Sequence, residues 1–117
     1  FTAAQAGSAV VLEWATATEL DNLGFNVYRA EMAAGPRTQL NGHLIPSQAP
    51  GSPMGASYQF VDESVRPGVT YYYWLEALDV HGAATVHGRV SAKITPLRRL
   101  LPARPRPVPL GPIVRSR

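Results

Sequence analysis

Apolar and polar residues alternate with a period of two in several short stretches of the chain. In residues 9–16, Val10, Leu12 and Trp14 fall on one side of an extended backbone, because neighbouring side chains of a strand point to opposite faces. No stretch sustains an apolar period of 3.6 residues, so the pattern predicts an all-β chain. Further strands are expected at residues 25–30, 58–62, 70–79 and 84–95, with short edge strands around Leu40 and Leu44-Ile45.

The predicted strand 70–79 is the most aromatic part of the chain. Its alternation places Tyr72 and Trp74 on one face, and Tyr28 of the neighbouring predicted strand joins them. An exposed group of this kind stacks against sugars or partner proteins, which makes the three residues a candidate aromatic platform. The alternative is ordinary cross-strand packing on a sheet face that is partly covered by loops.

The last predicted strand, residues 84–95, carries Val86, Val90 and Ile94 as its expected packing residues. Gly88 lies between the first two. A glycine inside a strand commonly marks a bulge or a bend, so an irregularity is expected there.

Five motifs follow one another within residues 8–95. They are Val10-x-Leu12-x-Trp14, Gly24-Phe25-x-Val27-Tyr28-Arg29, Tyr58-x-Phe60-Val61-Asp62, Val65-x-Pro67-Gly68-x-x-Tyr71 and Tyr73-x-Leu75-x-Ala77-x-Asp79-x-x-Gly82. Together they resemble a bacterial fibronectin type III-like domain over about three quarters of the chain. The resemblance implies a seven-stranded antiparallel β-sandwich with Trp14 in the core between the sheets, and a tyrosine corner in which Tyr71 bonds back to the backbone near Val65. Residues 1–7 match the usual first strand poorly, and the loop 46–57 is long for the family.

Charge divides the 117 residues into two unlike parts. Residues 1–95 hold five basic and all eight acidic side chains, a net charge of −3, and form the predicted sandwich domain. Residues 96–117 hold six arginines, no acid and six of the eleven prolines, a net charge of +6. Proline fixes φ and removes a backbone donor, so this segment, the C-terminal arm, is expected to be extended.

The C-terminal arm is the candidate partner-binding segment, because it carries aliphatic residues among its arginines. Three interpretations stay open: docking on a neighbouring subunit or on its own domain, a linker to an adjacent domain, and binding of an anionic polymer. Nucleic acid is the less favoured anion, since no aromatic residues for base stacking are interleaved with the arginines. The candidate binding residues are Arg98, Arg99, Leu100, Leu101, Arg104, Arg106, Val108, Leu110, Ile113 and Val114.

Motifs for catalysis are missing from the sequence. There is no cysteine, no Gly-x-Ser-x-Gly and no Gly-x-x-x-x-Gly-Lys, so we expect no enzyme activity and no cofactor. His81, His87 and Asp79 lie close in sequence, but solvated side chains are favoured over a metal site. Glu19 and Asp21 are interpreted as turn residues, with a calcium loop as the alternative. No apolar run is long enough to cross a bilayer.

These observations predict a non-catalytic structural or interaction module at the cell surface or outside the cell, the location resting on the resemblance alone. The arm would contact copies of the same chain or an adjacent domain, as in a self-assembling surface protein or fibre. The alternatives are a carbohydrate-binding accessory module of a secreted bacterial hydrolase, in which the aromatic platform binds polysaccharide, and an anion-binding arm.

Overall fold

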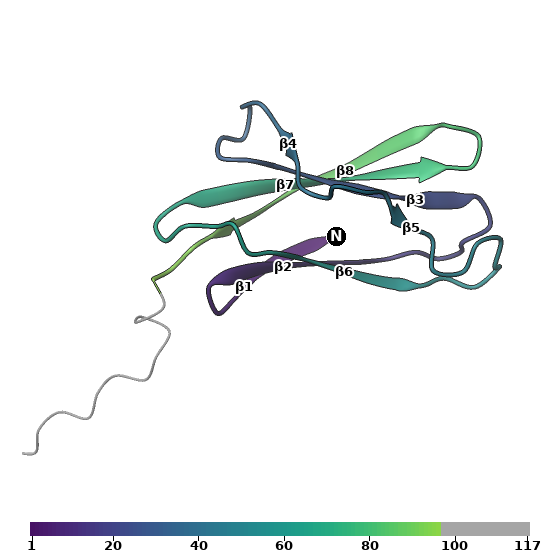
Figure 1. Cartoon of the computed structure of the whole chain (residues 1–117), viewed down its shortest axis with the longest axis horizontal. Helices are drawn as coiled ribbons and strands as arrows, with labels where there is room; N and C mark the ends of the chain where they lie inside the picture. Colours follow the sequence, from purple (N-terminus) through teal and green to yellow (C-terminus); the bar gives the residue numbers. More distant parts are fainter. Residues whose placement is uncertain (97–117) are drawn as a thin grey trace, which may run out of the picture.

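The computed structural model describes residues 1–96, which form two antiparallel sheets packed face to face (Figure 1). The first sheet consists of β1 (Thr2–Ala6), β2 (Ala9–Ala15) and β6 (Ser57–Asp62), in the order β1-β2-β6. The second has the order β4-β3-β7-β8, with β3 (Asn22–Ala30), β4 (Thr38–Gln39), β7 (Thr70–Asp79) and β8 (Ala84–Lys93); β5 (Ile45–Pro46) also pairs with β3. The described residues contain no helix, and so none that is long and apolar enough to span a membrane.

An aromatic cluster lies in the core between the sheets. Trp14 of β2 stacks on Tyr58 of β6 with ring centroids 5.6 Å apart, and Phe25 of β3 meets Tyr58 edge-on at 4.8 Å. All three side chains are buried, as are Val10 and Leu12 on the same face of β2. The alternation in residues 9–16 therefore predicted the buried face of this strand, because one face of a sandwich sheet must meet the other sheet.

The strand count differs from the expected seven. The described residues form eight strands, because β3 pairs with two separate two-residue strands, β4 and β5, along one edge. The poorly matched residues at the start of the chain do form a strand. Backbone pairing from Thr2↔Glu13 to Ala6↔Ala9 needs no particular side chains, and Gly7 supplies the positive φ (62°) of the tight turn into β2.

The expected tyrosine corner is present. The Tyr71 hydroxyl accepts a hydrogen bond from the Arg66 backbone N–H at 2.9 Å, and the Tyr71 side chain is fully buried. It thus ties β7 to the turn that precedes it.

Replacing Tyr71 with phenylalanine should lower the free energy of unfolding by about 1 kcal/mol, since one buried hydrogen bond is lost while the ring still fills its site. Urea unfolding of both proteins measures the difference. Tyr72→Phe, one residue along but on the opposite face of β7, is the matched control and should change stability by less. Equal effects of the two substitutions would contradict a role for the corner.

A β-bulge in β8 corrects the expected packing of Val86. Tyr73 pairs with Val90 but Trp74 pairs with Gly88, so Arg89 is an extra residue and the alternation of faces reverses there. Val90 packs against the core, whereas Val86 lies on the outer face and is 54% exposed. Gly88 has a φ of 125°, and an added Cβ would lie 2.8 Å from the Tyr73 carbonyl oxygen, so only glycine fits this position.

Candidate functional site

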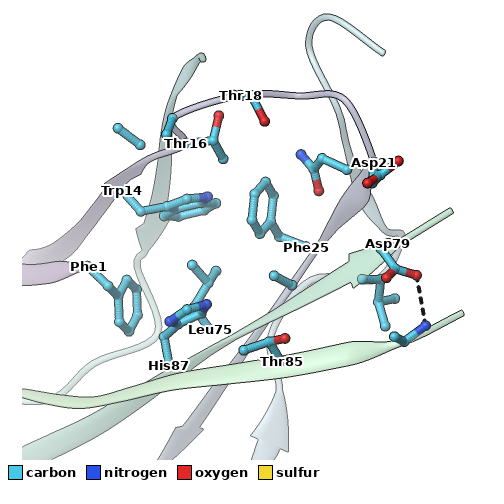
Figure 2. A pocket seen from close by; sticks show the side chains of 16 residues that line it. Phe1, Trp14, Thr16, Thr18, Asp21, Phe25, Leu75, Asp79, Thr85 and His87 are labelled. Atoms are coloured by element: carbon cyan, nitrogen blue, oxygen red, sulfur yellow. Dashed lines mark hydrogen bonds between the residues drawn. The ribbon is translucent and has the colours of Figure 1, made fainter. Parts of the chain in front are cut away.

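A pocket of about 470 Å³ opens between the two sheets at one end of the sandwich. We call it the inter-sheet pocket. Figure 2 shows its aromatic and aliphatic wall, formed by Trp14, Phe25 and Leu75. The polar lining comes from opposite sides, with Thr16 and Thr18 following β2 and with Thr85 and His87 on β8.

The bulge in β8 creates the polar wall of this pocket. Because the alternation reverses at Arg89, His87 pairs with Leu75 and shares its inward face, and Thr85 pairs with Ala77. A regular strand with Val86 facing the core would have turned both polar residues outward. The pocket was therefore not predicted from the sequence, although the irregularity expected at Gly88 pointed to the bulge that creates its polar wall.

Trp14 contributes an unusual group to the pocket. The side chain is 6% exposed, and its Nε1 atom is buried without a hydrogen-bond partner among the described residues. An unpaired buried N–H is costly, because its desolvation is not compensated by a protein acceptor. The pocket wall thus holds a donor whose hydrogen-bonding capacity is not satisfied by the described part of the chain.

Two acidic residues, Asp21 and Asp79, lie at the rim of the inter-sheet pocket. Asp79 Oδ1 accepts the backbone N–H groups of His81 (2.8 Å) and Ala83 (2.9 Å), so it shapes the β7–β8 turn. Across residues 1–96, no three His, Asp or Glu side chains come together as a metal-binding group would require. The local chemistry is therefore a cavity with an aromatic and aliphatic wall, a polar wall of threonines and His87, and a rim that carries two aspartates.

The free edge of the second sheet borders the pocket. Among residues 1–96, β8 is the last strand of that sheet (Figure 1). Its residues 84–89 are exposed. In an antiparallel pair, every second residue of a strand directs both its backbone N–H and its C=O to the same neighbouring strand. The Asp79 N–H donates to the Ala83 carbonyl at 2.9 Å, and this bond sets the alternation for β7 and β8. It follows that Thr85 and His87 direct their backbone groups to β7, whereas Ala84 and Val86 direct theirs to the free edge.

The candidate aromatic platform is not an open surface. Trp74 is only 5% exposed, and the Arg37 guanidinium lies over its ring, 3.8 Å from the centroid. Tyr72 has Arg89 at 5.5 Å from its ring, and the Tyr28 hydroxyl donates to Glu76 Oε1 at 3.1 Å. The three residues do share the outer face, but a sugar ring can stack on Trp74 only after Arg37 has moved. Binding by this face remains a prediction.

Glu19 is the centre of a buried polar cluster that fixes the long loop 46–57. Its carboxylate accepts hydrogen bonds from the hydroxyls of Ser47 (2.5 Å), Tyr58 (2.6 Å) and Thr16, and from the Asn22 amide (2.8 Å). Burial by itself raises the pKa of Glu19, but these four bonds outweigh burial and lower the pKa to about 2. Glu19 was interpreted from the sequence as a turn residue, and in the structure it anchors two loops.

A second buried carboxylate, Asp62, lies at the other end of the core. Its Oδ2 accepts hydrogen bonds from Arg29 Nη1 (2.9 Å) and from the Tyr73 hydroxyl (2.8 Å), and the Arg29 guanidinium lies 4.8 Å from the centre of the Tyr71 ring. Burial raises the pKa of Asp62, but the bonds from Tyr73, Arg29 and Ser64 outweigh it and lower the pKa. This cluster joins the two sheets, because Asp62 belongs to β6 and Arg29 and Tyr73 to β3 and β7.

The arm residues predicted to bind a partner, from Arg98 to Val114, lie outside the described residues. Their roles therefore rest on the sequence, and the described residues supply the surfaces that such a segment would meet.

The strand order and the tyrosine corner define an immunoglobulin-like β-sandwich of the fibronectin type III-like class. A crystal structure of a Fn3-like protein from Clostridium thermocellum superimposes with a TM-score of 0.55 at 23% sequence identity, covering 82% of this chain and 88% of that one. No protein-family model matches the sequence, and no curated protein does. The fold inferred from the motifs is thus confirmed by structural similarity.

Proposed function

We propose that this chain is a non-catalytic interaction module of a bacterial surface or extracellular protein, and that its C-terminal arm docks on a neighbouring subunit. The observation that carries the proposal is the charge division, with −3 on residues 1–95 and +6 on residues 96–117. Opposite charges on two parts of one chain attract neighbouring copies and steer their encounter. A body and an arm of the same sign would repel one another instead.

The two buried carboxylates of the sandwich, whose pKa values are lowered, support a structural role. A lowered pKa beside an open cleft commonly marks a catalytic acid or base. Here Glu19 and Asp62 are both almost fully buried, and their oxygens are occupied by hydrogen bonds from neighbouring strands and loops. Both groups therefore hold the fold together. The structural similarity to a Fn3-like protein supports the sandwich fold on which this proposal rests.

Removing the arm should abolish self-association. We expect the full chain to form dimers or larger species at low salt, and a chain that ends at Thr95 to stay monomeric, because the basic partner of the acidic domain is gone. Analytical ultracentrifugation at matched concentrations measures the difference, and thermal unfolding of the shortened chain checks that the sandwich is intact. Association of the full chain should also weaken at high salt, since exposed charges are screened. A shortened chain that assembles as well as the full one would disprove the proposal.

A further inference from the structure

We propose that residues 104–110 of one copy add as an antiparallel strand to the free edge of β8 in a neighbouring copy, beside the inter-sheet pocket. This inference rests on the proposed function and names the surface on which the arm docks. Three independent features lead to it: the unpaired backbone groups of β8, the spacing of prolines in the arm, and the pocket with its acidic rim.

The first feature is the edge itself. Ala84 and Val86 point their backbone N–H and C=O groups away from β7, as the bond between Asp79 and Ala83 requires. Edge strands that present such groups bind extended peptides by main-chain hydrogen bonding. Val86 adds an apolar side chain that is 54% exposed on the outer face. The edge thus offers both hydrogen bonds and an uncovered apolar contact.

The second feature is the alternation in the arm. Residues 104–110 read Arg-Pro-Arg-Pro-Val-Pro-Leu, with a proline at every second position. In a strand, the N–H groups of every second residue point to the same side, so Arg104, Arg106, Val108 and Leu110 retain every donor on one edge. The prolines fall on the other edge, where the missing N–H costs nothing. Proline also restricts each preceding residue to extended conformations, which are the conformations of a strand.

The third feature is the environment on the two faces of the added strand. Directly opposed residues of an antiparallel pair share a face, so the non-proline residues would lie beside Val86 on the outer face. Glu76 pairs with Val86 on that face. Its carboxylate accepts hydrogen bonds from the Asn26 amide and the Tyr28 hydroxyl, which are both neutral groups. An arginine of the added strand could therefore pair with the charge of Glu76. The prolines would lie on the inner face beside Thr85 and His87, at the mouth of the inter-sheet pocket. The arginines would then lie on the outer face near Glu76, and the prolines would cover the mouth of the pocket, whose rim carries Asp21 and Asp79.

Single cysteines test this geometry, because the chain has none of its own. One chain carries Val86→Cys. A second full-length chain carries one cysteine at a position from 106 to 110, made as Arg106→Cys, Pro107→Cys, Val108→Cys, Pro109→Cys or Leu110→Cys. After mixing and mild oxidation, we expect the best even position to give interchain disulfides at about ten times the yield of any odd position. An even residue can lie directly opposite position 86 with its Cβ atom within disulfide range, whereas odd residues point to the other face. Non-reducing gels of the two tagged chains measure the yield.

Two control variants make the result specific. Val61→Cys places a cysteine of similar exposure (43%) on β6, at the edge of the other sheet, and should give little cross-linking with any arm position. Exchanging Arg106 with Pro107 and Val108 with Pro109 keeps composition and charge but moves prolines onto the bonding edge. This exchanged chain should lose self-association, and its folded domain is untouched.

Several outcomes would overturn the inference. Equal yields at odd and even positions, cross-linking at Val61 as strong as at Val86, or unchanged association of the exchanged chain would each exclude strand addition at β8. If a double variant, Val86→Cys with Val108→Cys, formed only an intrachain disulfide, this result would exclude the neighbouring copy as acceptor. If removal of the arm still abolishes association in any of the first three cases, the proposed function stands and only this docking surface is wrong.

Discussion

Replacing Glu19 with alanine is expected to lower the free energy of unfolding by about 4 kcal/mol, because four hydrogen bonds to one buried carboxylate are lost together. The donors are the hydroxyls of Thr16, Ser47 and Tyr58 and the Asn22 amide. For a domain of this size the melting temperature should fall by roughly 20 °C. Chemical denaturation followed by Trp fluorescence measures the change, since Trp14 stacks directly on Tyr58.

The pH dependence separates the charge of Glu19 from its packing. The pKa falls from an ordinary value of 4.5 to about 2 on folding, so the carboxylate contributes its full stabilisation above pH 4.5 and loses it as the pH falls toward 2. Glu19→Gln keeps the shape but does not titrate, and its unfolding free energy should therefore fall less steeply than that of the native protein over this interval. Parallel curves for the two proteins would contradict the assignment, and so would an alanine variant as stable as the native chain.

Replacing Asp62 with alanine should destabilise the sandwich by about 3 kcal/mol, because Arg29 is left largely buried without its counter-charge. The Arg29 side chain is 17% exposed and also donates to Ser64, and the Tyr73 hydroxyl loses the same acceptor. The effect should reach both sheets, since Asp62 is on β6 and its two partners are on the opposite sheet. Urea unfolding at neutral pH gives the magnitude.

An exposed ion pair in the same protein provides the matched control. Arg66 and Glu31 lie 3.1 Å apart, but their side chains are 66% and 51% exposed. Glu31→Ala should therefore change stability by less than about 0.5 kcal/mol, because water solvates and screens both groups. If Asp62→Ala were as mild as Glu31→Ala, the buried cluster would contribute nothing to the joining of the sheets.

Strand positions were largely predictable from the sequence, because alternation reports directly which face of a strand is buried. Val10, Leu12 and Trp14 were assigned to one face and all three are in the core. The predictions that were wrong or incomplete concern a strand with an irregular backbone and a surface covered by a side chain from another loop. An irregularity was expected at Gly88 and is present, but the expectation for Val86 did not include its consequence, which is that one extra residue at Arg89 turns Val86 outward. Trp74 was expected on the outer face and is there, but Arg37 from a distant loop covers it.

Glu19 shows why the candidate site was less predictable than the fold. Its four donors come from positions 16, 22, 47 and 58, and no local pattern relates them. The inter-sheet pocket likewise combines residues that follow β2 with residues of β7 and β8. Such groups meet only after the sheets have packed, so their spacing along the chain carries no periodic signal.

The sequence by itself determined the class of fold, the buried faces of the main strands, the tyrosine corner and the division of charge between domain and arm. The all-β class, the buried faces and the division of charge follow from local alternation, turn residues and composition, which act before any long-range contact forms. The sandwich topology and the tyrosine corner were implied by the resemblance of the motifs to the fibronectin type III-like family. The tertiary structure alone decided that Glu19 anchors two loops, that Arg37 covers Trp74, and that a bulge turns His87 into a pocket beside a free edge. Each depends on side chains brought together from different strands, and packing of the two sheets sets those distances.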